Sequence, residues 1–248
     1  MRFTYGGKCD EGCLERAHSF SLSPISFFGT QSSSDAEKQS SSDACQQFST
    51  AAYPTYCSDG TPYSDSCSGT KVSHDRGHQV PANNFDNDAV AIEETNYMVN
   101  IMPQAAQMNR GAWLKTEMMV ECWRNEKPVS VVGGAVFLED CTDSSCSVPE
   151  WGSVDRSEWF VHSHGVKNAA YYWKLIIRSD DEHIAFWMPN HESAKASAID
   201  DYVVRVVDLE ANLAKWGAGE TFTLEGDKNK VESAVGPNWA EPLGCFRG

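Results

Sequence analysis

Apolar residues cluster into strand-like runs in the second half of the chain. Three such runs are residues 128–139, 169–179 and 183–190. They are rich in Val, Ile, Tyr, Trp and Phe, the residue types that favour strands. The polar stretch Asp-Asp-Glu-His at 180–183 predicts a hairpin turn between the last two runs. Residues 198–219 then predict a short strand and a helix that ends at Gly217 or Gly219.

A helical period replaces the strand pattern between residues 105 and 124. At about 100° per residue, one stripe of this helix is apolar and is predicted to be buried. The stripe contains Trp113, Met119, Val120 and Trp123. On one flank of the stripe lie Asn109, Glu117 and Arg124. Polar side chains at such a boundary can be held firmly by the core and still reach a cleft.

Together these patterns predict one α+β domain over residues 1–248, with a central antiparallel sheet flanked by helices. Residues 1–70 are rich in Ser, Asp and Gly and predict loops pinned by cysteines. Residues 71–81 predict the end of a strand that runs into a loop, which Pro81 closes. After a further apolar stretch, Pro103 is expected to limit any strand or helix.

Nine cysteines are a high count for 248 residues, and five of them lie within the first 67. A polar segment of that kind cannot build a core unaided. We therefore expect disulfides and an oxidising compartment, which predicts a secreted protein. Zinc binding is the alternative, although the chain contains no C-x-x-C pair. Cys141–Cys146 and Cys57–Cys67 are candidate bridges, but the full pairing stays open. The odd count leaves at least one thiol free or paired between chains.

The net charge of −15, taken alone, argues against a nucleic-acid partner, because phosphate binding rests on Lys and Arg. The charge is uneven, however. Residues 71–127 carry six basic and eight acidic side chains, a net charge of −2, while the other 191 residues carry −13. A divalent cation would supply positive charge locally. The chain has no apolar run of about 18 residues, so no membrane partner is expected.

One polar loop, residues 73–86, combines groups that suit phosphate chemistry. His78 can take a proton near pH 7 as a general base. Arg76 carries a planar guanidinium that fits phosphate oxygens. In an extended segment these two side chains share one face, while Asp75 points to the other face and can anchor the loop.

Two residues of the predicted helix suit a metal ion. A hard cation such as Mg²⁺ keeps most of its waters and takes only one or two protein oxygens. The side-chain carbonyl of Asn109 could be such a ligand. Glu117, two turns further along, could hold the waters around the ion.

Three motifs in this region resemble those of the DNA/RNA non-specific endonucleases of the ββα-metal type. They are D-R-G-H at 75–78, N-Y-M-V-N-I-M-P-Q at 96–104 and M-N-R-G-A-W-L-K-T-E at 108–117. The resemblance implies the ββα-metal nuclease fold, with two strands and a helix around one ion and residues 71–127 as the catalytic core. The implied activity is Mg²⁺-dependent hydrolysis of DNA and RNA with little sequence preference, leaving 5′ phosphates.

The resemblance also implies roles for single residues. His78 matches the general base, Asn109 the direct ligand of the ion, and Glu117 the acid that holds the ion through water. Arg76 and Asn100 match groups that support the phosphate and the transition state. Mn²⁺ or another divalent ion is the alternative to Mg²⁺.

The chain departs from the family at one positive charge. Members often have an arginine on an early strand, but no arginine lies between Arg16 and Arg76. Arg124 or Lys71 could supply that charge near the phosphate. The low positive charge also leaves open an endonuclease selective for double-stranded DNA, or an inactive nucleic-acid-binding or toxin module. The protein is expected to meet its DNA or RNA substrate as a monomer or homodimer.

Overall fold

The computed structural model describes a defined set of residues. They are 2–5, 56–57, 71–72, 74–85, 89–96, 100–138, 141, 144–147, 169–216, 223, 235–236, 238–243 and 245. Residues 2–5, 56–57, 71–72 and 93–94 are described by their backbone alone. The predicted Cys57–Cys67 bridge and the side chain of Lys71 therefore lie outside the described residues.

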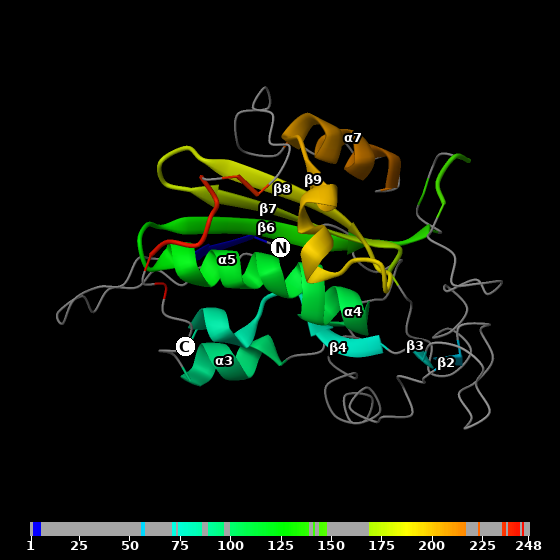
Figure 1. Ribbon diagram of the computed structural model, residues 1–248, viewed down its shortest axis with the longest axis horizontal. Coiled ribbons are helices and arrows are strands. Elements are labelled where there is room, and N and C mark those ends of the chain that lie inside the picture. The colour runs from blue at the N-terminus through cyan, green and yellow to red at the C-terminus, as the bar shows by residue number, and fades with distance from the viewer. Residues whose placement is uncertain are drawn as a thin grey trace, which may run out of the picture.

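A five-stranded antiparallel sheet forms the centre of the fold (Figure 1). In spatial order its strands are β1 (Arg2–Tyr5), β6 (Val129–Val136), β7 (Tyr171–Arg178), β8 (His183–Pro189) and β9 (Val203–Val204). The three predicted strand runs are confirmed as β6, β7 and β8. The predicted hairpin turn is confirmed too, since Asp181 adopts a φ of 63° and the Arg178 N–H donates to the Glu182 carbonyl at 2.8 Å.

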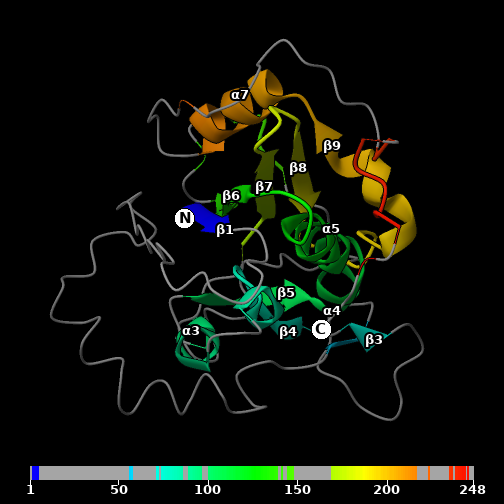
Figure 2. The same ribbon diagram turned by 90° about the vertical axis from the view of Figure 1, so that its left-hand side faces the viewer.

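Helices cover both faces of this sheet (Figure 2). α7 (Val206–Trp216) lies on one face, and α5 (Leu114–Arg124) lies on the other. Side chains alternate along β7, so Trp173 packs into the apolar cluster on the α7 face and Tyr172 into the cluster on the α5 face. The cluster on the α5 face also contains Val80, Phe85 and Ala105, which belong to the region of the two-stranded ribbon formed by residues 74–78 and 101–105. One apolar core therefore joins the sheet to this ribbon.

A two-stranded antiparallel ribbon lies beyond α5 (Figure 2). β4 (His74–His78) pairs with β5 (Ile101–Ala105), with Arg76 opposite Pro103. The expectation that Pro103 would limit a strand is therefore wrong. The Pro103 carbonyl accepts hydrogen bonds from Tyr172 Oη at 2.9 Å and Asn190 Nδ2 at 3.1 Å, so it points away from β4. The proline nitrogen lies on that same side of the strand, where β4 requires no donor.

Short elements complete the described structure. They are β2 (Tyr56–Cys57), β3 (Lys71–Val72), η3 (Ala82–Phe85), α3 (Ala89–Thr95) and η7 (Ala196–Tyr202). β2 pairs with β3, and α3 with η3 connects β4 to β5. The sequence patterns did not predict β1 or α3. Among the described residues, no helix has the length and apolar character needed to cross a membrane.

The predicted helix over 105–124 is confirmed, but a kink divides it. It consists of α4 (Ala106–Met108), a π-helical segment η5 (Asn109–Trp113) and α5. The break lies at Gly111, whose φ of −116° and ψ of −105° are not helical. A Cβ on Gly111 would lie 2.9 Å from the backbone nitrogen of Ala196, so the kink lets the loop after β8 approach the helix. The predicted buried stripe is confirmed, with Trp113, Met119 and Val120 buried and Trp123 partly so.

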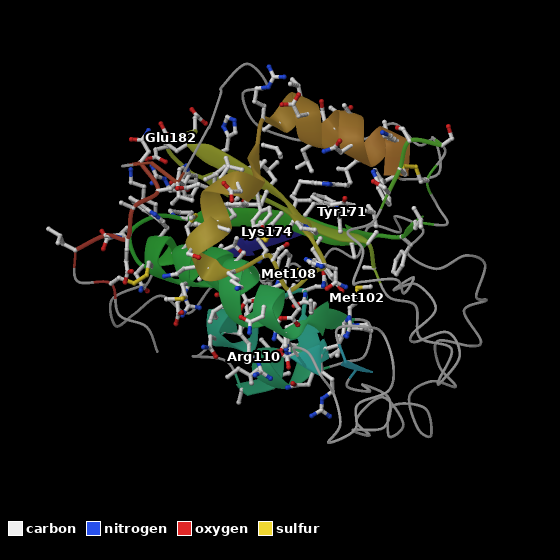
Figure 3. All side chains as sticks on the ribbon, turned by 45° about the vertical axis from the view of Figure 1, so that its right-hand side comes forward. Met102, Met108, Arg110, Tyr171, Lys174 and Glu182 are labelled. Atoms are coloured by element: carbon white, nitrogen blue, oxygen red, sulfur yellow. A yellow bond between two sulfur atoms is a disulfide. The ribbon has the colours of Figure 1, made fainter. Side chains whose placement is uncertain are left out.

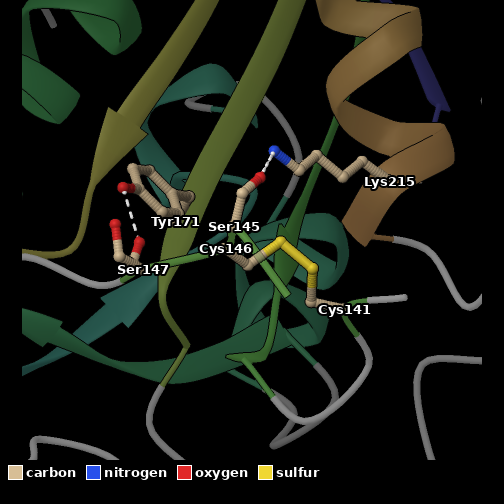
Figure 4. The surroundings of a disulfide bond; sticks show 6 residues. All are labelled: Cys141, Ser145, Cys146, Ser147, Tyr171 and Lys215. Carbon is tan, nitrogen blue, oxygen red and sulfur yellow. Dashed lines mark hydrogen bonds between the residues drawn. A yellow bond between two sulfur atoms is a disulfide. The ribbon is translucent and has the colours of Figure 1, made fainter. Parts of the chain in front are cut away.

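Two disulfides are present among the described cysteines. Cys141–Cys146 confirms one candidate bridge. Around it, the Lys215 ammonium donates to Ser145 Oγ and the Tyr171 hydroxyl donates to the Ser147 carbonyl, so this segment is tied to α7 and β7 (Figure 4). Cys122–Cys245, which closes 123 residues of sequence, joins α5 to the C-terminal segment and was not predicted.

Replacement of Asn190 is expected to loosen the junction between β5 and the sheet. Its fully buried amide accepts from the Ala105 N–H at 2.7 Å and donates to the carbonyls of Pro103 and Ala169. Asn190→Ala removes the side-chain partner of the Ala105 N–H and of the Pro103 and Ala169 carbonyls. The free energy of unfolding, measured by chemical denaturation, should therefore fall by about 2–4 kcal/mol. Asn212→Ala, at a half-buried position of α7, is the matched control and should change it by less than about 1 kcal/mol. Equal losses in both variants would contradict this account of the junction.

Candidate active site

Two hydrogen bonds attach the helix to strand β4 and bring the first and third motifs together. Near one end of β4, Asn109 Nδ2 donates to Asp75 Oδ2 at 3.0 Å. At the other end, the Trp113 indole N–H donates to the His78 carbonyl at 3.0 Å. The predicted base and the predicted metal ligand therefore sit on adjoining elements with a fixed register.

Asp75 is the centre of this attachment. Besides Asn109, it accepts two hydrogen bonds from Arg110, at 2.7 Å from Nε and 2.6 Å from Nη2. The sequence-based expectation that Asp75 anchors the loop is consistent with these contacts. Since the Asn109 amide nitrogen is committed to Asp75, its carbonyl oxygen Oδ1 is the atom left to bind a cation.

His78 is half-buried and has one neighbour that fixes its tautomer. Its Nε2 lies 3.2 Å from Asn96 Oδ1, and Asn96 in turn donates its Nδ2 to the Ile92 carbonyl. Because an amide oxygen can only accept, Nε2 carries the proton and Nδ1 has the free lone pair. Burial lowers the pKa of His78 below its ordinary value, more than the hydrogen bond to Asn96 raises it. The ring is therefore neutral at neutral pH, as a general base requires.

Asn100 holds the loop that follows His78. Its side chain is buried and bonds to backbone groups of the described residues. It accepts from the Val80 N–H and donates to the carbonyls of Val80 and Thr95, at 2.7 to 2.9 Å. These bonds use the amide oxygen and both amide hydrogens. A direct contact between Asn100 and the phosphate stays a prediction, and the contacts seen here are those of a residue that positions the base.

Gly77 has a steric reason to be glycine. A Cβ at this position would lie 2.1 Å from Cδ and 2.2 Å from Oε1 of Gln104. Gln104 is fully buried, so its side chain would have to shift within the core to admit a Cβ. The glycine of D-R-G-H and the glutamine of the second motif therefore occupy one space and keep β4 and β5 in register.

Glu117 has an unusual environment for an acid. Burial raises the pKa of Glu117 well above its usual range, while the nearby Lys174 and the Trp113 N–H oppose that rise and Glu121 adds to it. Lys174 comes from β7 and is itself buried, with Nζ 2.8 Å from Thr116 Oγ1 and 3.7 Å from the centre of the Trp113 ring (Figure 3). Sequence reasoning missed Lys174; the available signal was a single lysine inside an otherwise apolar strand.

The structure describes two of the three predicted phosphate-binding side chains, those of Arg76 and Arg124. Arg76 is exposed on β4, and the side chain of Lys71 is outside the described residues. Arg124 ends α5, fifteen positions after Asn109, which is about 22 Å along a helix axis. Arg124 lies on the same side of the helix as Asn109, but far from it along the helix axis. It is therefore badly placed to bind a phosphate held beside Asn109.

One cluster of potential metal ligands among the described residues lies elsewhere. Cys122, Glu241 and Cys245 bring their ligand atoms within 4.8 Å of one another. The two cysteines form a disulfide, so they have no thiolates to offer. This cluster does not compete with Asn109 as a candidate metal site.

Comparison with known proteins identifies the family of the chain. A model of the DNA/RNA non-specific endonuclease family matches residues 23–223, and the chain belongs to this family.

The chain is similar to several named nucleases. It is 28% identical over 147 residues to the mitochondrial nuclease EXOG of Danio rerio, covering 56% of this chain and 41% of that protein. It is 26% identical over 153 residues to the mitochondrial nuclease of Saccharomyces cerevisiae, covering 56% and 44%. The matched part thus spans less than half the length of these relatives. A solved structure of the EndoG/EndoGI complex aligns over 60% of both chains, with 22% identity and a TM-score of 0.44.

The prediction of a secreted protein is wrong, because the named relatives are mitochondrial nucleases. That prediction rested on the cysteine count. Disulfides indicate the redox state of a compartment and do not specify which compartment it is.

Alanine at position 77 tests the steric fit between the first two motifs. Gly77→Ala should lower the free energy of unfolding by about 1–3 kcal/mol, because its Cβ overlaps the buried Gln104 side chain. Gln104→Ala removes the overlapping atoms. The double variant should therefore lose less stability than the two single variants added together, as measured by urea denaturation. Strictly additive losses would mean that the two residues do not share this space.

Proposed function

We propose that the chain is a divalent-metal-dependent endonuclease that hydrolyses phosphodiester bonds of DNA and RNA with little sequence preference. The observation that carries the proposal is the pair of hydrogen bonds between β4 and the helix, Asn109 to Asp75 and Trp113 to His78. It couples a neutral His78, whose Nδ1 can accept a proton, to an Asn109 whose Oδ1 can bind a cation. Because the ββα unit and the central sheet share one core, we treat the chain as a single nuclease domain.

In the proposed reaction, His78 removes a proton from the attacking water through Nδ1. The water oxygen forms a bond to phosphorus while the bond from phosphorus to the 3′ oxygen breaks, so the phosphate stays on the 5′ side. Asn96 keeps the imidazole in the required tautomer. Trp113 holds the carbonyl of His78 itself, and Asn100 holds the backbone of Val80, two residues further along the chain. Arg76, exposed on the same strand, is proposed to contact the substrate phosphate.

The donor atoms at the site fit a hard cation. Asn109 Oδ1 is an amide oxygen whose orientation Asp75 fixes, and Glu117 lies further along the same helix. Oxygen donors of this kind, completed by water, suit Mg²⁺ or Mn²⁺ rather than a metal that prefers sulfur or nitrogen. When bound, the cation would supply positive charge to the phosphate and to the leaving oxygen. We propose Asn109 as its direct ligand and Glu117 as its partner through water.

Loss of the imidazole at position 78 should abolish most of the activity. His78→Ala is expected to lower turnover on supercoiled plasmid by about 10²–10⁴-fold, because no other described group replaces the base. EDTA should stop the wild-type enzyme completely, and added Mg²⁺ should restore it. The same assay on RNA and on single-stranded DNA measures the substrate range. Full activity of His78→Ala with an unchanged unfolding midpoint would reject the mechanism.

The pH profile should report the lowered pKa of His78. Activity is lost on the acid side as the ring takes up a proton, so the midpoint of that limb in kcat/KM should lie below 6.5, the ordinary value for histidine. Asn96→Ala removes the hydrogen bond that raises the pKa, so the acid limb should move to still lower pH. A limb centred above 6.5, or one that moves toward neutral pH in Asn96→Ala, would show that His78 is not the titrating base.

A further inference from the structure

Arg110 is exposed to solvent and yet held in one orientation. It directly follows Asn109 in the π-helical segment, and 72% of its side chain is exposed. Its guanidinium forms a bidentate ion pair with the Asp75 carboxylate: Nε donates to Oδ2 at 2.7 Å and Nη2 donates to Oδ1 at 2.6 Å. Figure 3 shows Arg110 on the β4 side of the helix, whereas Lys174 lies toward the sheet. A long exposed side chain is usually mobile, so this fixation calls for an explanation.

The contact with Asp75 leaves part of the guanidinium available. Arginine has five N–H donors, and the Asp75 carboxylate takes two of them along the Nε–Nη2 edge. None of the described residues forms a hydrogen bond with Nη1. The Nη1–Nη2 edge is a second fork of the same kind, and it suits the oxygens of a phosphate.

We propose that Arg110 binds a backbone phosphate of the nucleic-acid substrate through its Nη1–Nη2 edge, beside the ligand position of Asn109, while Asp75 holds its other edge. This inference rests on the proposed nuclease function and adds a substrate contact that the motifs did not assign. Asp75 then orients two neighbours at once: the amide of Asn109 and the guanidinium of Arg110.

The surroundings of Arg110 make a directed contact more important than a general positive field. The protein carries a net charge of −15, and Glu192 acts on Arg110 in addition to Asp75. The local sum of these three side chains is negative. Among the protein groups here, a phosphate is therefore best held by N–H donors that point at its oxygens, which a guanidinium fixed along one edge provides.

A second arginine in the chain provides a matched control. Arg205 forms the same bidentate ion pair with Asp208, at 2.6 Å from both Nε and Nη2, and is also exposed. It directly precedes α7 in the chain, and α7 lies across the sheet from α5 and the β4–β5 ribbon (Figure 2). Arg205→Ala removes the same charge and breaks the same kind of ion pair, but at a site remote from the proposed substrate.

The test is binding of a duplex DNA oligonucleotide at several KCl concentrations in the presence of Mg²⁺. All variants carry His78→Ala so that the DNA is not cut, and the dissociation constant is measured by fluorescence anisotropy. Loss of one phosphate contact should reduce the slope of log affinity against log salt by about 0.9. Arg110→Ala should show this change and bind roughly tenfold more weakly at low salt, while Arg205→Ala should match the parent.

A conservative variant separates charge from geometry. Arg110→Lys keeps the charge and should keep the salt slope, but it cannot grip Asp75 and a phosphate together, so it should recover only part of the affinity. An unchanged slope in Arg110→Ala, or equal changes in Arg110→Ala and Arg205→Ala, would overturn the inference. Failure of the nuclease proposal itself would appear separately, as plasmid cleavage that survives His78→Ala or EDTA.

Discussion

The site depends on one carboxylate. Asp75 receives three hydrogen bonds from two consecutive residues of the kinked helix, Asn109 and Arg110. A carboxylate can only accept, so it forces the Asn109 amide to present its nitrogen to Asp75 and its oxygen elsewhere. The same contact fixes the guanidinium of Arg110. One acidic side chain on strand β4 thereby sets the direction of both groups proposed to meet the metal and the phosphate.

The rest of the fold keeps that carboxylate and the helix in register. Gly77 and Gln104 fit together between β4 and β5, and Asn190 ties β5 to the sheet. Trp113 reaches from the helix to the carbonyl of His78, and the Lys174 ammonium lies over the face of its ring. Asn190 and Trp113 thus form hydrogen bonds with the backbone of β5 and β4, and these bonds position the ribbon relative to the sheet and the helix.

Much of this arrangement could be predicted from the sequence, for identifiable reasons. Strands β6 to β8 follow from runs of β-branched and aromatic residues, and the helix from its apolar period. Three short motifs gave the candidates for the base and the ligand, His78 and Asn109, and these roles stay predictions. The sequence patterns missed α3 because seven residues are too few to show a period, and they missed Cys122–Cys245 because its partners are 123 positions apart.

Other features of the site depend on three-dimensional distances that a pattern does not contain. A helical wheel gives the angle of Arg124 but not its height along the axis, so it grouped Arg124 with Asn109. The sequence patterns did not single out Arg110, because its contact with Asp75 joins residues 35 positions apart. The contact of the Lys174 ammonium with Thr116 joins strand β7 to helix α5, whose residues here lie 58 positions apart in sequence.

The central claim is that Asn109 Oδ1 is the protein atom that binds the catalytic cation. A crystal of the His78→Ala variant soaked in Mn²⁺ would test it directly through anomalous scattering. The account predicts one strong peak about 2.1 Å from Asn109 Oδ1, with Asp75 still bonded to the Asn109 amide nitrogen and water completing the shell. A peak ligated by other residues, with Asn109 Oδ1 engaged in a hydrogen bond within the protein, would contradict it.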